Sequence, residues 1–271
     1  MNDIIEKFEQ WFDDYTAAFF ADFKNDEFVS SNLRLKYDHS LRVRDEMRFL
    51  AEKLSLNKAN TTIAVLTGLL HDTGRFEQFC RFRTYDDRCS VDHSLYGVQI
   101  LQEASLPTGL SEQQMQMMLT AIKHHGSKKL PDDISGDKLL LCKMIRDADK
   151  LDSLAVAAEG FRQYYTDKQH NADSDKPLWG VRLPDSPEYC PEIYQAVMTG
   201  GLVDYGLVRT TTDFKLCFLS WVYDVNFDVT LERIKQRGLI EAFIEMLPDN
   251  NDMHRIAEAV REYINSGRNL Q

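Results

Sequence analysis

The sequence predicts an all-α protein, a helical bundle followed by a C-terminal helical extension. Apolar residues recur at spacings of three or four over most of the chain up to about residue 160, as on one face of an α-helix. The alternating pattern of β-strands is weak in the same region. Asp92 and Ser111 stand directly before helical segments, where N-caps are expected. These three observations favour helices packed on helices.

Six helices are expected in the first part of the chain. The first is amphipathic, with aromatic residues along one stripe. The second carries His39 on its apolar inner face. The third is an apolar run that ends at the dipeptide His71-Asp72, after which Gly74 is expected to stop the helix. The predicted ranges are Ile4 to about Phe23, about Asn32 to Leu54, Asn60 to Asp72, a helix that follows Asp92, Glu112 to His125, and Asp137 to about Glu159.

The remaining segments are expected to be loops and short helices. The polar and aromatic stretch from Glu77 to Ser90 has no clear period, which predicts a loop over the mouth of a site. After Gly160 the chain becomes rich in Pro, Asp and Gly, which predicts a long excursion. We expect residues 1–165 to form the helical core and residues 166–271 a helical cap on it, with a separate C-terminal domain as the alternative. Short helices are expected at Ile193–Met198, Phe214–Tyr223, Thr230–Arg237 and Met253–Asn265.

Composition excludes several classes of protein. The net charge of -11 argues against broad binding to duplex nucleic acid or to anionic membranes. No run of about 18 apolar residues appears, so no membrane span is expected. The five cysteines form no CxxC pair, and the N-terminus lacks the basic start of a signal peptide. We therefore expect a cytoplasmic protein with reduced cysteines. The sequence does not predict an oligomeric state.

Histidines and aspartates at predicted helix ends form an ordered pattern in the first part of the chain. An adjacent His-Asp pair, an adjacent His-His pair and a DAD segment opening an apolar stretch are together unusual. Helices of a bundle can aim such groups at one interior point. Mixed imidazole and carboxylate ligands suit one or two divalent ions of Mn, Fe, Co, Ni or Zn rather than Ca. The predicted ligands are His39, His71, Asp72, His93, His124, His125 and Asp149.

The pattern His39, His71-Asp72 and Asp149 resembles the HD superfamily of metal-dependent phosphohydrolases, over roughly Tyr37 to Leu154. The additional histidines resemble the fuller ligand set of the HD-GYP phosphodiesterases, although the chain has GSKKLPDDISG in place of a GYP loop. The context is closer to stand-alone bacterial HD-domain hydrolases. The resemblance implies that a first ion takes His39, His71, Asp72 and Asp149, and that a second takes Asp72 as a bridge with His93, His124 and His125.

Other residues near these motifs are candidates for catalysis and substrate binding. Arg75 stands where HD-GYP proteins carry a phosphate-binding lysine, and its forked guanidinium suits phosphate oxygens; a surface arginine is the alternative. Lys150 either neutralises charge near the site or is solvated. Asp152 either shares the helical face of Asp149 or is exposed. We predict catalytic roles for Asp72 and Arg75, and substrate binding by Arg75 and Lys150.

These residues predict a metal-dependent phosphohydrolase or phosphodiesterase. Its small-molecule substrate would be a nucleotide or related phosphoester, attacked by a metal-activated water at a mono- or dinuclear site. One alternative is a di-iron oxygenase, because the inositol-oxygenase branch of the same fold uses a similar ligand set. A second alternative is a regulator that binds metal without turnover.

Overall fold

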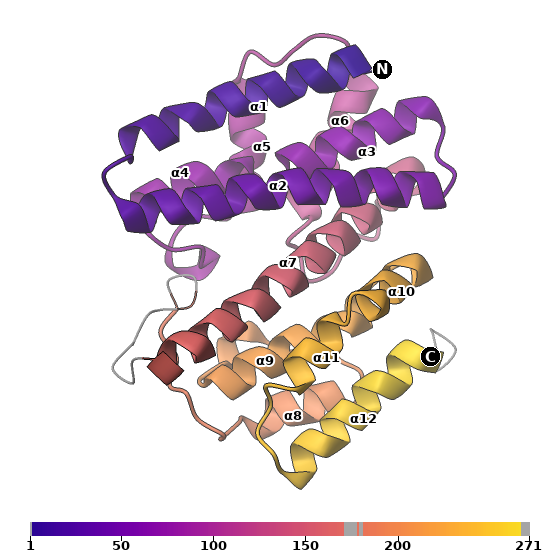
Figure 1. Ribbon diagram of the computed structural model, residues 1–271. Helices are drawn as coiled ribbons and strands as arrows, with labels where there is room; N and C mark the ends of the chain where they lie inside the picture. The colour runs from indigo at the N-terminus through magenta and orange to yellow at the C-terminus, as the bar shows by residue number, and fades with distance from the viewer. Residues whose placement is uncertain (1, 171–177, 179–180, 267–271) are drawn as a thin grey trace. The chain divides into compact units, whose positions relative to one another are not determined.

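The computed structural model describes residues 2–170, 178 and 181–266, and this part of the chain is helical (Figure 1). The only β-pairing among these residues is an isolated bridge between Leu178 and Val181, so the predicted all-α fold is confirmed. The chain divides into two compact units, Met1–Asp152 and Ser153–Gln271, and the division falls within helix α7 (Gly136–His170). The predicted boundary after residue 165 also lies in α7. The arrangement of residues 166–271 as a cap on the core stays a prediction.

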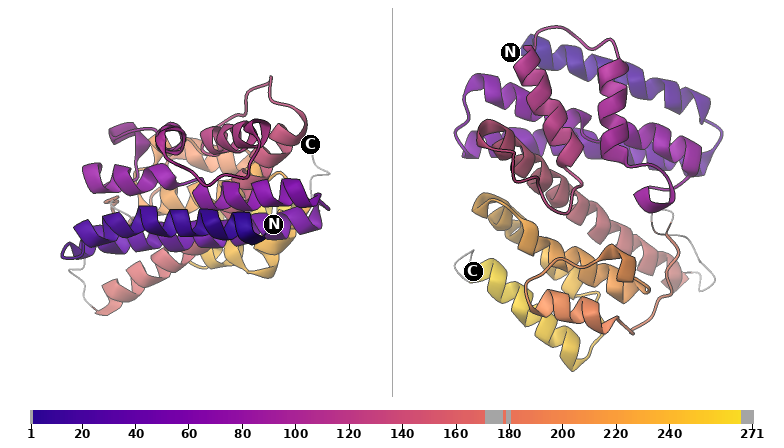
Figure 2. Two further views of the ribbon diagram at one scale, coloured as in Figure 1. Left: turned by 90° about the horizontal axis from the view of Figure 1, so that it is seen from above. Right: turned by 180° about the vertical axis from the view of Figure 1, so that it is seen from behind.

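The first unit begins with three helices that lie side by side (Figures 1 and 2). Asp26 caps the second helix by accepting a hydrogen bond from the backbone N–H of Val29, and Asn57 caps the third in the same way. Fully buried aromatic and aliphatic side chains such as Phe8, Phe12 and Leu66 fill the space between the helices. The three helices are α1 (Asn2–Asp22), α2 (Glu27–Lys53) and α3 (Lys58–Leu70).

The segment after His71 differs from the prediction. His71 is the C-cap of α3, and Asp72 directly precedes a further helix, α4 (Thr73–Phe82). Gly74 therefore lies inside a helix and does not stop one. The predicted loop is confirmed only from residue 83, where Arg83 ends α4 with a positive φ of 54°. Among residues 84–92 the chain forms a single 3-10 turn, η1 (Asp87–Cys89).

The next two helices begin where the sequence predicts. Asp92 caps α5 (His93–Glu103) by accepting hydrogen bonds from the backbone of Ser94 and Leu95. Ser111 caps α6 (Glu112–His124) in a reciprocal capping box with Gln114. Helix α7 begins as expected but continues to His170, because Ala157, Ala158 and Phe161 extend its buried face. The long excursion predicted after Gly160 therefore does not begin there, and part of it lies outside the described residues.

The second unit contains short helices around an aromatic cluster. The rings of Phe161, Phe214, Phe218 and Phe243 contact one another in this cluster. The four predicted short helices are confirmed, and α11 is an additional one. No helix of the described residues has the length and apolar character needed to cross a membrane. The helices are α8 (Pro191–Met198), α9 (Thr211–Ser220), α10 (Asp228–Gln236), α11 (Leu239–Ile244) and α12 (Asn251–Ser266).

Candidate metal centre

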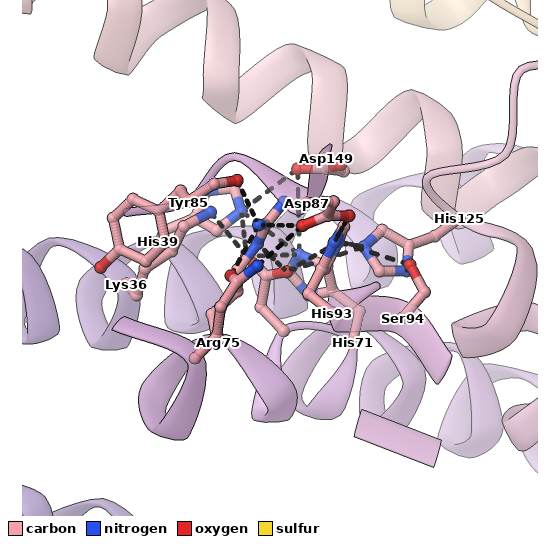
Figure 3. Close-up of polar contacts among 12 residues, drawn as sticks. Lys36, His39, His71, Arg75, Tyr85, Asp87, His93, Ser94, His125 and Asp149 are labelled. Carbon is pink, nitrogen blue, oxygen red and sulfur yellow. Dashed lines mark hydrogen bonds and ion pairs between the residues drawn. The ribbon is translucent and has the colours of Figure 1, made fainter. Parts of the chain in front are cut away.

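Four imidazoles of the first unit converge on one interior point (Figure 3). His39 lies on α2, His71 caps the end of α3, His93 is the first residue of α5, and His125 caps the end of α6. Each has no more than 6% of its surface exposed. Burying four polar rings is costly unless their nitrogens find partners.

Each imidazole is held by its Nδ1 atom. Carbonyl and carboxylate oxygens accept hydrogen bonds, so each Nδ1 donates and each Nε2 of a neutral ring keeps a lone pair. The acceptors are backbone carbonyls for two rings and carboxylates for the other two. The pairs are His39 with Asp152 Oδ2 at 2.6 Å, His71 with Gly68 O at 2.8 Å, His93 with Asp87 Oδ2 at 2.6 Å, and His125 with Ile122 O at 2.7 Å.

The four Nε2 atoms face one another in two pairs. His39 Nε2 lies 3.2 Å from His71 Nε2, and His93 Nε2 lies 3.0 Å from His125 Nε2. Two lone pairs at such distances repel unless a proton or a cation is shared between them. Imidazoles oriented by Nδ1 partners are typical of metal ligands. The donor set therefore fits metal ions.

The carboxylate of Asp72 lies between the two pairs. Its Oδ2 is 3.5 Å from the Nε2 atoms of His39 and His71, and its Oδ1 is 3.6 Å from those of His93 and His125. Asp149 Oδ1 is 3.2 Å from His39 Nε2. The ligand atoms form overlapping groups that can each hold an ion. These groups are His39–His71–Asp72, Asp72–His93–His125 and His71–His125–Asp149.

The electrostatics of the site keep two of the imidazoles and the Asp72 carboxylate ready to bind a cation. Burial lowers the pKa of His71 to about 3. Burial, with the nearby charge of Arg75, lowers the pKa of His93 to about 4. Burial alone would raise the pKa of Asp72, but the ammonium of Lys36 holds it well below its usual value. At neutral pH both imidazoles are therefore neutral and the aspartate is ionised.

Two cationic side chains flank Asp72. Lys36 Nζ lies 2.7 Å from Asp72 Oδ2, and Arg75 Nε lies 3.7 Å from Asp72 Oδ1. Both cations also stand over the ring of Tyr85, at 5.4 and 5.7 Å from its centroid. Lys36 was not predicted from the sequence. Its position three residues before His39 puts it on the same face of α2, and this spacing was the available signal.

His124 is the predicted ligand that the structure does not bring into the cluster. It belongs to none of the metal-binding groups found among the described residues. Its Nδ1 lies 3.4 Å from Ser127 Oγ. Consecutive helical residues point about 100° apart, and here the Nε2 atom of His125 faces His93 while the ring of His124 faces Ser127. Lys150 follows Asp149 on α7 and is partly exposed, and its role stays a prediction.

Two aspartates support the imidazoles without belonging to the predicted ligands. Asp152 is buried, with 3% exposure, and Arg42 Nε donates to it at 2.6 Å, so it is not a solvated residue. Asp87 lies on η1, in a segment whose sequence shows no periodicity. No local pattern distinguishes it from the adjacent Asp86, so sequence reasoning missed it.

Comparison with known proteins identifies the segment that carries this cluster. The family model of the HD domain matches residues 37–154. The match contains the four converging histidines together with Asp72 and Asp149. No curated protein and no solved structure matches the chain.

Proposed function

Because residues 37–154 match the family model of the HD domain, we propose that the chain is a metal-dependent phosphohydrolase or phosphodiesterase. Its substrate would be a nucleotide or related phosphoester. The observation that carries the proposal is the placement of Asp72, whose two oxygens face two separate imidazole pairs. A carboxylate in this position can bridge two ions, as dinuclear phosphoesterases require.

We assign each ion to one side of Asp72. The first would be held by His39, His71, Asp72 and Asp149. The second would be held by the other oxygen of Asp72 with His93 and His125, so His125 replaces the predicted pair of histidines. When bound, divalent transition metals supply Lewis acidity, which activates water and stabilises charge on phosphoryl oxygens.

The chain itself supplies positive groups for a phosphate. Three acceptors surround Arg75 Nη1, namely Gln78 Oε1, the carbonyl of Tyr85 and Asp87 Oδ1. Its buried Nε makes no hydrogen bond among the described residues. Arg75 is therefore fixed by Nη1 and can offer its other terminal nitrogen to phosphate oxygens. Lys36 provides a second cation on the opposite oxygen of Asp72, and Lys150 stays a candidate for substrate contact.

The proposal is tested by metal analysis combined with turnover. The protein, purified without oxygen, is expected to hold up to two transition-metal ions and to hydrolyse bis(p-nitrophenyl) phosphate or p-nitrophenyl phosphate in a metal-dependent way. Removal of the ions by a chelator should abolish turnover, and Mn²⁺ should restore it. Oxygen consumption by a di-iron centre without phosphoester cleavage would support the oxygenase instead. Metal binding without turnover of any phosphoester would support a regulator.

A pair of neighbouring variants tests the assignment of the second ion. His125→Ala removes a buried ligand and is expected to lower the affinity of one ion by at least about 100-fold, with little effect on the other. His124→Ala is the matched control, because it deletes the adjacent imidazole and should leave both affinities unchanged. Isothermal titration with Mn²⁺ measures the affinities of the two ions in each variant. A loss of metal in His124→Ala equal to that in His125→Ala would contradict the assignment.

A further inference from the structure

The turn η1 presents Asp87 toward the candidate metal centre. Asp86 caps this turn by accepting a hydrogen bond from the backbone N–H of Arg88 at 3.0 Å. The fully buried Gln78 ties the turn to α4, because its amide nitrogen donates to Asp87 Oδ1, Ser90 Oγ and the Val91 carbonyl. The turn is therefore anchored from inside the unit, and its carboxylate is held in place.

Asp87 uses its two oxygens for two different partners. Oδ2 accepts from His93 Nδ1 at 2.6 Å, and Oδ1 accepts from Arg75 Nη1 at 2.8 Å (Figure 3). A carboxylate on Nδ1 fixes the ring orientation of a ligating imidazole and raises its basicity. The same residue holds the guanidinium that stands beside Asp72 Oδ1.

We infer that Asp87 is a positioning residue that sets the affinity of the second ion and couples that ion site to Arg75. The inference rests on the proposed dinuclear centre. It follows from the separation of the supporting carboxylates, because Asp152 holds His39 of the first ion site whereas Asp87 holds His93 of the second. Each supporting carboxylate has its own cationic anchor, which is Arg42 for Asp152 and Arg75 for Asp87.

Charge adds to orientation in this arrangement. The guanidinium of Arg75 lies close to the second ion site and would repel a cation bound there. Asp87 balances that charge and keeps Nη1 turned toward η1. Removal of the carboxylate therefore weakens the binding of the second ion in two ways. The imidazole of His93 loses its hydrogen-bond acceptor, and the positive charge of Arg75 is no longer balanced. Among the described residues, the potential metal-binding group that contains Asp87 joins it to Asp92 and His93 and includes none of the ligands assigned to the first ion.

The test uses Mn²⁺ as the probe. Asp87→Asn is expected to lower the affinity of one Mn²⁺ by about 10–100-fold and to leave the other unchanged in isothermal titration. At equal Mn²⁺ loading, its electron paramagnetic resonance spectrum should change from that of a spin-coupled pair to that of an isolated ion. Asp152→Asn should instead weaken the binding of the first ion. Asp86→Asn is the matched control, because it removes the same charge from the same turn and Asn still caps it.

The coupling of Asp87 to Arg75 is tested separately, by the KM for a phosphoester. At saturating Mn²⁺ the weakened site is refilled, yet Asp87→Asn should keep a KM for bis(p-nitrophenyl) phosphate raised about tenfold, because Arg75 Nη1 loses the one charged group among its three acceptors. Circular dichroism and the thermal midpoint confirm folding, and Asp87→Ser repeats the test should Asp87→Asn fail to fold.

The outcomes separate this inference from the proposed function. A wild-type protein that binds two Mn²⁺ ions, with an Asp87→Asn variant whose affinities and spectrum are unchanged, overturns the role in metal binding and leaves the dinuclear centre intact. An unchanged KM overturns the coupling to Arg75. A wild-type protein that never binds a second Mn²⁺ overturns the inference together with the dinuclear centre.

Discussion

The Asp72→Ala protein is expected to hold less than one ion per chain and to lose at least about 10³-fold in kcat toward a phosphoester. The reason is that both ions share this carboxylate in the proposed centre. Its removal also leaves the ammonium of Lys36, now 2.7 Å from Asp72 Oδ2, and the guanidinium of Arg75 without their shared counter-charge. Two unbalanced cations beside the site oppose the binding of any further cation. Metal content by mass spectrometry and kcat on the metal-supplemented protein measure the two losses.

Asp72→Asn sharpens this test, because the amide keeps the shape of the side chain and one of its two ligand oxygens. It is expected to retain at most one ion, whereas Asp72→Ala retains neither at stoichiometric metal. Asp86→Asn, which removes a nearby carboxylate charge but keeps the cap of η1, serves as the control for the loss of an acidic residue. Full metal content and turnover in Asp72→Ala would show that the carboxylate bridges nothing.

The converging histidines could be predicted because their signals are local. His71 and Asp72 end an apolar helix, and His125 ends the helix that Ser111 begins. His71 and His125 are the C-caps of their helices, where the chain turns and a side chain can point into the bundle. The adjacent His124 carries the same chemical signal, but it lies one helical step away and faces Ser127. Residue type alone could not separate the two.

The supporting residues could be predicted only in part. Asp152 follows Asp149 by three positions, so the helical period already suggested a shared face. Asp87 has no such period, because its orientation depends on a turn that Gln78 anchors from another element. Long-range contacts of this kind leave no pattern in the sequence around the residue itself.

The error at Gly74 has a different cause. Glycine near the end of a helical pattern commonly marks a C-cap, and this convention predicted a helix stop. Here the missing side chain serves a close approach between helices, because a Cβ on Gly74 would collide with the carbonyl oxygen of His93 and lie 2.7 Å from the backbone nitrogen of Gly97. Only the packing of α4 against α5 distinguishes these two uses of glycine.

This close approach makes Gly74→Ala the variant with the largest expected effect on the fold. The added methyl group meets backbone atoms, which cannot yield as a flexible side chain would, so α4 and α5 must separate. We expect a loss of about 1–3 kcal/mol in the free energy of unfolding, measured by denaturant titration. The loss should exceed the gain in helix propensity, which is at most about 1 kcal/mol.

The same displacement should reach the metal centre, because the carbonyl that the methyl group meets belongs to His93 itself. The affinity of the second ion is therefore expected to fall in Gly74→Ala, while the first ion, held from α2, α3 and α7, is retained. Gly97→Ala is the matched control on the facing helix: its Cβ would lie 3.2 Å from the nearest backbone atom, which requires only a small shift. It should stay within about 1 kcal/mol of the wild type. Equal stability and equal Mn²⁺ affinities in both variants would mean that α4 and α5 do not need to touch for His93 to be in place.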